Sequence, residues 1–248
     1  GGIYMSLVLR PTTAPESIPL VSIVAGYSVA MAIREVTGLP AMLKWPNDVL
    51  VEGRKVCGIL CEMVLPPASP ATPAAASEPI AASSPPSSPA PSAPPSSPAS
   101  SRPQAEHALG ASGPRPHLQR PLLVVGIGIN ACIDPSSLPP EVRGTACSLS
   151  SLLGDEINPS ILAAAVLNRF EPAYLQFLDD GLAPFLQGIR EVAAFLGEPV
   201  AIGNRSKGDM GLVQGIFREI DAQGRAIVEL PGGERMAFSA GDLSLRRT

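Results

Sequence analysis

The chain has 248 residues, 45% of them hydrophobic, which is enough to build one large or two ordinary domains around a sizeable core. Its net charge of −4 and pI near 5.3 argue against a dedicated nucleic-acid binder, because such proteins usually carry a basic face. We identify neither a signal peptide nor an uninterrupted apolar stretch as long as a membrane helix, so we expect a cytoplasmic protein without membrane association.

The first ordered region is predicted over residues 1–64. A strand is expected from Ile3 to Leu9, and because a chain rarely begins inside a sheet, we expect a fragment of a longer protein. From Ile18 to Val36, apolar residues recur at steps of three and four, which predicts a helix. The segment Gly38-Leu39-Pro40 should end that helix.

Two short strands are predicted next, at Ala41–Trp45 and Lys55–Met63. They flank the turn-like Pro46-Asn47-Asp48 and the tip Glu52-Gly53-Arg54, so we expect a hairpin. Residues from about 65 to 120 are nearly all proline, alanine and serine, a composition that cannot repay the entropy of ordering. We expect a disordered insertion there, either a tolerated loop or a segment that binds a partner through its proline runs.

Order resumes with an apolar strand from Pro121 to Ile129, followed by helices from Asn158 or Pro159 to about Leu178 and from Leu182 to Leu196. After residue 198 the pattern changes to short strands at close spacing, which indicates a small barrel. We therefore divide the chain into residues 1–198 and 199–248. Strands are expected in the second part at Val200–Ile202, Gly211–Ile220, Ala226–Glu229, Arg235–Phe238 and Leu243–Arg246.

The ends of the predicted hairpin strands carry the side chains with most chemistry. Lys44, Asn47 and Asp48 lie close to one strand end, and Lys55 begins the next strand. A lysine beside the exposed backbone of Gly58 suits an anion, since glycine allows close approach. The same residues also suit a solvated hairpin tip, and composition leaves both interpretations open. The four cysteines have no metal-ligand spacing, and Cys57 and Cys61 are expected to be core thiols.

Three separated motifs resemble those of biotin protein ligases. KWPNDV at residues 44–49, followed by GRKVCGIL at 53–60, resembles the central signature of that family. GIGIN at 126–130 and GDLSLR at 241–246 resemble two further family strands, and the similarity covers residues 1–64 and 121–247. The resemblance implies an α+β fold in which a mixed sheet packs with helices, like the catalytic domain of class II aminoacyl-tRNA synthetases. It also implies a small C-terminal SH3-like β-barrel.

The family uses ATP and Mg²⁺ to activate biotin as biotinyl-5'-AMP, then transfers biotin to a lysine of a biotin carboxyl carrier protein domain. By resemblance, Lys55 contacts the biotin carboxylate and the adenylate phosphate, in a reaction that needs fixed cations more than a covalent nucleophile. Asp48 matches a carboxylate near the incoming lysine, where it is expected to orient the amine or take its proton, although it is also a residue that caps turns. Asn47 and Asn130 match positions that help to place the metal and the phosphates, and amide oxygens suit Mg²⁺.

The biotin pocket of the family is lined by its first strand, which makes Tyr4 and Ser6 candidates because residues two apart share a face. A flat floor beneath the biotin ring is expected from residues of the next two strands, namely Gly58, Ile59, Gly126 and Gly128. Nucleotide contacts are implied for Lys44, Arg246 and Phe238, the last either stacking on adenine or packing in the barrel. Trp45 is expected to pack in the core.

The sequence departs from the family in one important respect. A glycine-arginine loop, G-R-G-R-x-x-R, which closes over the adenylate, is absent here, so we expect this chain by itself to bind biotin and ATP weakly. Two alternatives stay open: a related lipoate-attaching enzyme, and an inactive remnant that serves only as a binding module. A homodimer is also left open, and DNA binding is expected only if a further N-terminal domain exists.

Overall fold

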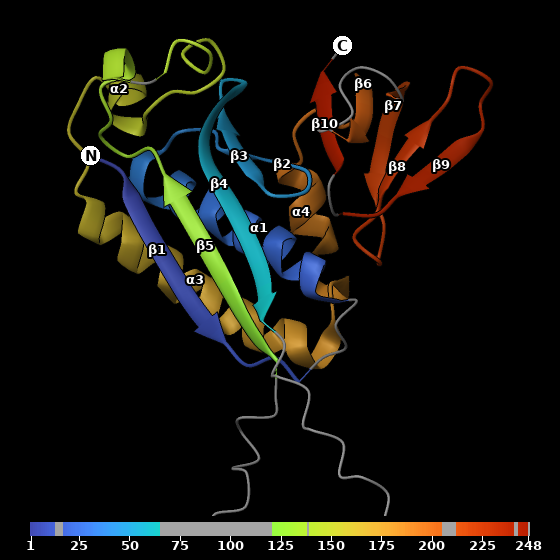
Figure 1. Ribbon diagram of the computed structural model, residues 1–248, viewed down its shortest axis with the longest axis horizontal. Coiled ribbons are helices and arrows are strands. Elements are labelled where there is room, and N and C mark those ends of the chain that lie inside the picture. The colour runs from blue at the N-terminus through green and yellow to red at the C-terminus, as the bar shows by residue number, and fades with distance from the viewer. Residues whose placement is uncertain (13–16, 65–120, 138, 205–211, 241–242, 248) are drawn as a thin grey trace, which may run out of the picture. The chain divides into compact units, whose positions relative to one another are not determined.

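Five strands of the computed structural model form an antiparallel sheet in the order β1-β5-β4-β3-β2 (Figure 1). Their bounds are β1 Ile3–Leu9, β2 Met42–Lys44, β3 Asp48–Val51, β4 Arg54–Val64 and β5 Leu122–Ile129. The structure describes residues 1–12, 17–64, 121–137, 139–204, 212–240 and 243–247, so the expected insertion at 65–120 lies outside it. All four strand pairings are antiparallel, rather than the mixed sheet that we expected.

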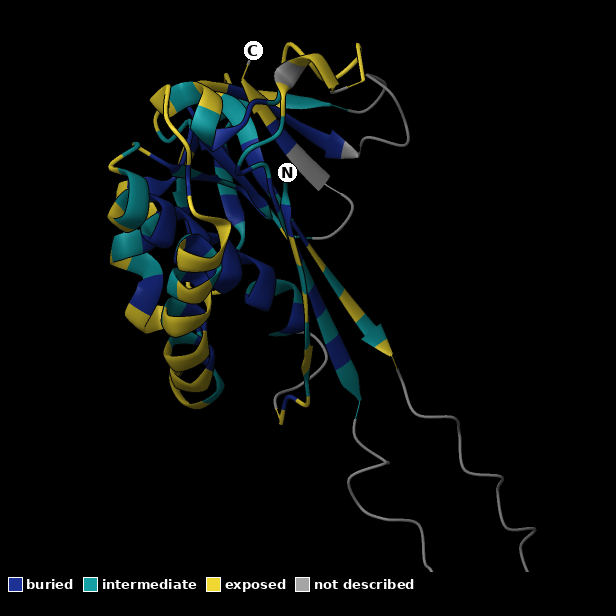
Figure 2. Ribbon diagram, turned by 90° about the vertical axis from the view of Figure 1, so that its left-hand side faces the viewer, coloured by how far each residue is buried: buried dark blue, intermediate teal, exposed yellow. Residues whose placement is uncertain are grey.

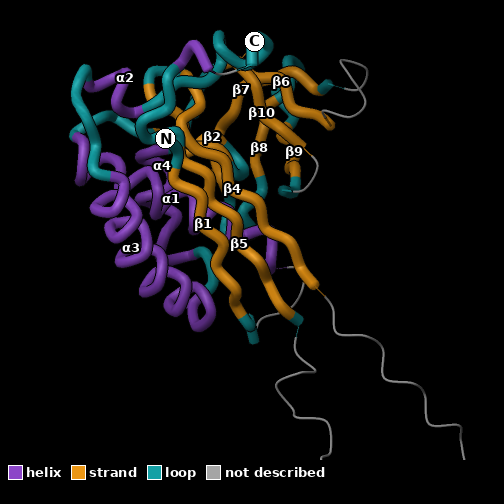
Figure 3. Tube along the Cα trace, turned by 60° about the vertical axis from the view of Figure 1, so that its left-hand side comes forward, coloured by secondary structure: helices purple, strands orange, loops and turns teal. Residues whose placement is uncertain are grey.

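The sheet has one face covered by helices and one open face. Side chains alternate along β1 and β5 between buried and more exposed positions, as a half-buried strand requires. The buried side chains pack against α1 (Ile18–Thr37) and α3 (Pro159–Asp180), which Figures 2 and 3 show gathered on one side of the sheet. The open face presents large apolar side chains, such as Val8, Leu60 and Val64.

Helix α1 lies where the apolar periodicity predicts it. It ends at Gly38, whose φ of 73° closes the helix in the left-handed region that glycine adopts without strain. By length and composition this helix would also suffice to cross a membrane, but 61% of that window is buried inside the fold. Its buried face contacts α3 and β4, and this packing is that of a core helix.

The remaining helices range in length from 5 residues to the 22 residues of α3. Helix α3 begins at the expected place, where the Asn158 side chain accepts hydrogen bonds from the backbone of Ser160 and Ile161. Helices α2 (Leu149–Leu153) and α4 (Leu186–Val192) are joined to the fold by loops, and short 3₁₀ turns lie at Pro135–Ser137 and Ala183–Phe185. The helix predicted from Leu182 to Leu196 is therefore too long at both ends.

A second antiparallel sheet follows in the order β10-β6-β7-β8-β9. Its bounds are β6 Pro199–Asn204, β7 Val213–Ile220, β8 Ala226–Glu229, β9 Arg235–Phe238 and β10 Leu243–Arg247. The five predicted strands are confirmed to within two residues at each end, and the predicted change at residue 199 coincides with the start of β6. Closure of these strands into an SH3-like barrel stays a prediction.

Residues 193–198 are held between the two sheets instead of continuing α4. The Ala194 amide donates a hydrogen bond to the Leu43 carbonyl of β2 at 2.8 Å, and Ala193 forms a parallel bridge with the same residue. Nearby, the Trp45 indole donates to the Gly224 carbonyl at 2.9 Å. Trp45 is almost fully buried, which confirms the expectation that it packs in the core. These backbone contacts with β2 are the reason that the helix stops at Val192.

Cys57 is a core thiol, as predicted, while Cys61 is half-buried. Burial raises the pKa of the Cys57 thiol to about 12. Only the thiolate is nucleophilic, so at pH 8 we expect iodoacetamide to modify Cys57 at least about 100-fold more slowly in the folded chain than in urea. Mass spectrometry of a time course measures this, and equal rates would contradict it. The same burial stabilises the fold below the unfolded thiol pKa, and this contribution is lost as the pH rises towards 12.

Candidate functional site

A row of residues crosses all five strands of the first sheet on its open face. Tyr4 of β1 lies opposite Gly128 of β5, which lies opposite Gly58 of β4. Gly58 lies opposite Asp48 of β3, and Asp48 lies opposite Lys44 of β2. Because directly opposed residues in antiparallel strands project to the same face, this row joins an aromatic ring, two bare glycines and a charged pair.

Asp48 binds two lysines at the charged end of this row. Its Oδ2 accepts a hydrogen bond from Lys44 Nζ at 3.1 Å, and its Oδ1 forms an ion pair with Lys55 Nζ. The Asp48 side chain is 11% exposed, whereas that of Lys55 is 41% exposed. The buried carboxylate thus fixes two ammonium groups, one of which reaches solvent. Their summed charge is positive, as an anion-binding group requires.

The irregular backbone at this point explains why Lys55 reaches Asp48. The register between β3 and β4 shifts between Val49 and Leu50, which is a β-bulge. Bulges commonly redirect a side chain near functional sites. The Lys55 backbone also pairs with a neighbouring loop, through its amide to the Thr145 carbonyl at 2.7 Å and its carbonyl to the Cys147 amide at 3.0 Å. The main chain of Lys55 is therefore fixed independently of its side chain.

The two glycines of the row leave space that a side chain would fill. A Cβ added at Gly58 would stand 2.9 Å from Lys55 Nζ and 3.8 Å from Asp48 Oδ1. A Cβ at Gly128 would make ordinary contact with the Tyr4 ring at 3.7 Å. Tyr4 itself is 78% exposed, so its ring borders this open floor. The floor is flat and apolar beside a cationic corner, a combination that suits a ligand with a ring and a negative charge.

A second row runs parallel to the first, with Ser6 opposite Gly126 and Gly126 opposite Leu60. This places Ser6 and Tyr4 on one face, as predicted from their spacing, and extends the open floor by another glycine. Ile59 does not belong to it. Its side chain is 3% exposed and lies on the helix side, in the buried core. The prediction that Ile59 forms part of the floor is therefore wrong for its side chain.

A pocket of about 490 Å³ adjoins the lysines. It brings together residues from the first sheet, a loop, the linking segment and the last strand: Lys44, Leu50, Gly53, Lys55, Thr145, Phe195, Arg246 and Arg247. The predicted residues Lys44, Lys55 and Arg246 thus line one cavity. Four of the lining side chains are cationic, which makes the pocket suited to a polyanion such as a nucleotide phosphate chain. Phe195 and Arg247 were missed, because no sequence motif marks their approach to this pocket.

Three other predicted nucleotide residues do not line this pocket. The Asn47 side-chain Nδ2 donates a hydrogen bond to the backbone carbonyl of Ile59 at 2.8 Å. In return, the backbone amide of Ile59 donates to the backbone carbonyl of Asn47 at 2.9 Å. This reciprocal pair fastens the turn after β2 onto β4. Asn130 follows β5, and its backbone amide donates a hydrogen bond to the backbone carbonyl of Val56. Phe238 lies on β9, half-buried against the hydrophobic core.

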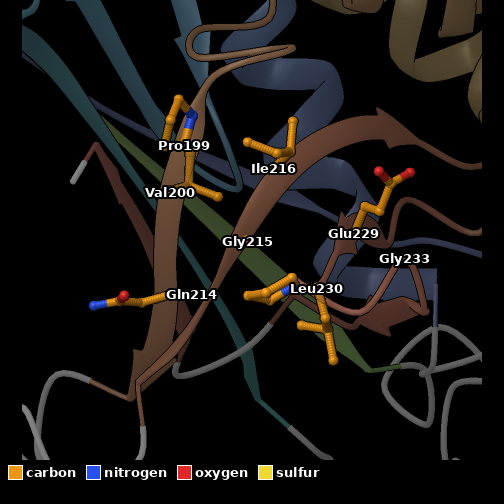
Figure 4. A pocket seen from close by; sticks show the side chains of 9 residues that line it. Pro199, Val200, Gln214, Gly215, Ile216, Glu229, Leu230 and Gly233 are labelled. Carbon is orange, nitrogen blue, oxygen red and sulfur yellow. The ribbon is translucent and has the colours of Figure 1, made fainter.

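Another pocket, of about 430 Å³, lies on the second sheet and differs in character (Figure 4). Glu229 is the charged residue among those that line it. Its carboxylate is held by Arg218 at 2.8 Å and Arg235 at 3.4 Å, and these partners lower the pKa of Glu229. Among the residues that line this pocket none is cationic, whereas four cationic residues line the lysine pocket, so charge and not size favours the lysine pocket for a nucleotide.

Comparisons with known proteins identify families and relatives to which this chain is similar. A family model described as "Biotin/lipoate A/B protein ligase family" matches residues 1–69, and one described as "Biotin protein ligase C terminal domain" matches residues 195–246. The first match ends before most of the proline-rich insertion, and the second begins at Phe195. The two matches therefore include both lysines of the pocket and Arg246, whereas Arg247 lies one residue beyond the second match.

The chain is similar to several relatives at low identity. It is 26% identical over 243 residues to the bifunctional ligase/repressor BirA of Bacillus subtilis. The aligned region covers 96% of this chain and 57% of that protein. It is 25% identical over 249 residues to a biotin--[acetyl-CoA-carboxylase] ligase of Paracoccus denitrificans, covering 97% and 79%. The crystal structure of the biotin protein ligase from Aquifex aeolicus has the same fold, with a TM-score of 0.69, 24% identity, and 100% and 83% coverage. The chain spans a little over half the length of the Bacillus relative.

Proposed function

We propose that the chain is a biotin protein ligase, an ATP-dependent enzyme that activates biotin and attaches it to a protein lysine. The observation that carries this proposal is the convergence of Lys44, Lys55 and Arg246 on one pocket beside a glycine floor. A bicyclic ring with a carboxylate tail fits the floor, and a nucleotide fits the pocket.

The first step joins the two ligands. A carboxylate oxygen of biotin attacks the α-phosphorus of ATP, the bond to the bridging oxygen of the β-phosphate breaks, and pyrophosphate leaves with the electron pair. Negative charge grows around the α-phosphorus, so fixed cations stabilise the transition state. Lys55 stands where the floor meets the pocket, and we assign it the leading electrostatic role. Lys44 and Arg246 would bind the remaining phosphate charge.

The second step transfers biotin to the carrier domain. The acceptor amine attacks the acyl carbon of biotinyl-5'-AMP, AMP leaves, and the amine loses a proton. We infer that Asp48 acts chiefly by holding Lys55 and Lys44, since both of its carboxylate oxygens are engaged with them. This positioning role replaces the expected role of Asp48 as the group that takes the proton.

Mg²⁺ would enter with ATP, because this ion favours phosphate oxygens and keeps several waters. The described residues contain no group of three or more His, Cys, Asp or Glu side chains that could hold a metal ion. The amide oxygens of Asn47 and Asn130 remain our candidates for an indirect contact. In Asn47 the amide nitrogen is committed to the Ile59 carbonyl, which leaves Oδ1 as the atom that would face a cation or its water.

A lipoate ligase is the second candidate function. The first family model covers both biotin and lipoate ligases, whereas the second describes biotin protein ligases and matches residues 195–246. Those residues supply Phe195 and Arg246 to the pocket. This contribution supports biotin over lipoate. The carrier domain, a homodimer, cytoplasmic location and DNA binding stay predictions.

Exchange of labelled pyrophosphate into ATP tests the proposed function directly. We expect the natural gene product to catalyse exchange that depends on biotin, and to label a purified biotin carrier domain when that domain is added. Lipoate in place of biotin serves as the control and should give no exchange above background. Exchange with lipoate but not with biotin would contradict the proposal, and so would the absence of exchange with either acid.

A further inference from the structure

Phe195 has a backbone conformation that is unusual for its size. Its φ is 65°, in the left-handed region where a Cβ meets the following carbonyl, and bulky residues rarely adopt it. Glu52 is the other non-glycine residue with positive φ among those that the structure describes, and it lies in an exposed tip. Strained residues of this kind persist only where surrounding structure imposes them, and they cluster at functional sites.

Hydrogen bonds on both sides of Phe195 impose the conformation. On the N-terminal side, the Ala194 amide donates to the Leu43 carbonyl of β2 at 2.8 Å. On the C-terminal side, the Glu198 amide donates to the Phe195 carbonyl at 3.0 Å, and the Gly197 amide donates to the Phe217 carbonyl of β7 at 2.7 Å. The segment is thus tied to the first sheet before Phe195 and to the second sheet after it. The main chain at this residue is set by both sheets.

The consequence is that an aromatic ring lines the cationic pocket. Phe195 is half-buried and shares that pocket with Lys44, Lys55, Arg246 and Arg247. It is the one aromatic side chain among the lining residues. Four cations match a polyphosphate, and an aromatic face beside them offers a surface on which a flat ring can stack. A ligand that uses both carries a flat ring and a phosphate chain, which describes a nucleotide.

We propose that Phe195 is a specificity-determining residue that contacts the nucleobase of ATP. This inference rests on the proposed function and deepens it, because it assigns the base contact to a residue outside the motifs at 44–60 and 126–130. The base would lie against the Phe195 ring while the phosphates reach the lysines. The resemblance leaves Phe238 either stacking on adenine or packing in the barrel, and Phe238 lies on β9, half-buried against the core, and does not line this pocket.

The test compares two probes, ATP and inorganic tripolyphosphate, on the natural gene product and its Phe195→Leu variant. Leucine keeps apolar bulk and the same backbone constraint, and circular dichroism with thermal unfolding checks the fold. Base–aromatic contacts are worth enough that we expect ATP to bind about tenfold more weakly to the variant by calorimetry. Tripolyphosphate has no ring, so its affinity should change less than about twofold. The KM for ATP should rise while the KM for biotin stays unchanged, and Phe195→Tyr should restore ATP binding.

The outcomes separate this inference from the proposed function. If the wild type binds ATP but Phe195→Leu binds it equally well, the inference fails and the ligase proposal stands. Equal losses for ATP and tripolyphosphate would reduce Phe195 to a structural residue and overturn the inference. A loss of ATP binding in Phe238→Leu, with Phe195→Leu unaffected, would assign the base contact to β9 and overturn it as well. A wild type that binds neither probe would contradict both proposals.

Discussion

Lys55→Ala is expected to slow biotin-dependent pyrophosphate exchange by at least about 100-fold. This is the usual cost of removing one preorganised group that stabilises negative charge in a transition state. Lys55 is the lysine at the boundary between the glycine floor and the cationic pocket, and its ammonium reaches solvent. Exchange kinetics measured over a range of biotin and ATP concentrations give the effect. We expect kcat/KM to fall for both substrates, because both lose the same cation.

The variant should keep its fold, since the backbone of Lys55 makes its own bonds to Thr145 and Cys147. Arg54→Ala is the matched control. It removes a cation at the adjacent position, but Arg54 pairs at 3.5 Å with Glu52 at the exposed tip and does not line the pocket. Its exchange rate should stay within about twofold of wild type. Unchanged exchange in Lys55→Ala, or an equal loss in Arg54→Ala, would remove Lys55 from its assigned role.

Much of the fold could be predicted from the sequence because local rules and packing agree there. The apolar periodicity of α1 continues until a glycine with positive φ, and Asn158 caps α3 where the pattern begins. Turns that contain Gly224 and Gly233 separate β7 from β8 and β8 from β9, and both glycines are visible as turn signals in the sequence. At these positions the residue types alone determine where an element starts or stops.

The failures occur where distant segments decide the local structure. Residues 193–196 have an apolar pattern that continues a helix, yet the hydrogen bonds of Ala194 to β2 and of Gly197 to β7 hold this segment in a turn instead. The same bonds place Phe195 in the pocket. Ile59 was assigned to the floor with its glycine neighbour, but adjacent strand residues face opposite sides. This alternation, applied to Gly58 as a floor residue, excludes the adjacent Ile59 side chain from the floor.

The charged part of the site was predicted by resemblance and not by composition. Lys44, Asp48 and Lys55 are ordinary residues for a hairpin tip, and composition alone left that interpretation open. What the sequence does not contain is the β-bulge between Val49 and Leu50, which shifts the pairing of Lys55. Nor does it show that Asp48 engages both lysines at once. Because of that arrangement, we expect Asp48 to position the lysines, whereas the resemblance implies that it acts on the incoming amine.

Asp48→Asn is expected to impair adenylate formation as well as transfer, each by about tenfold or more. Asparagine keeps the size of the side chain but loses the charge that holds Lys44 and Lys55, so Lys55 no longer has a fixed position against the phosphate. A residue that serves only as the base for the incoming amine would behave differently. Its loss would leave pyrophosphate exchange intact and slow only the transfer step.

The two half-reactions can be measured separately on the same variant. Pyrophosphate exchange reports adenylate formation, and rapid mixing of preformed biotinyl-5'-AMP with the carrier domain reports transfer. If Asp48 positions Lys55, the losses in the double variant Asp48→Asn with Lys55→Ala should be clearly less than additive, because the carboxylate then has no Lys55 to hold and only its contact with Lys44 is left to lose. Additive losses in the double variant, or a defect confined to transfer, would return Asp48 to the role of proton acceptor.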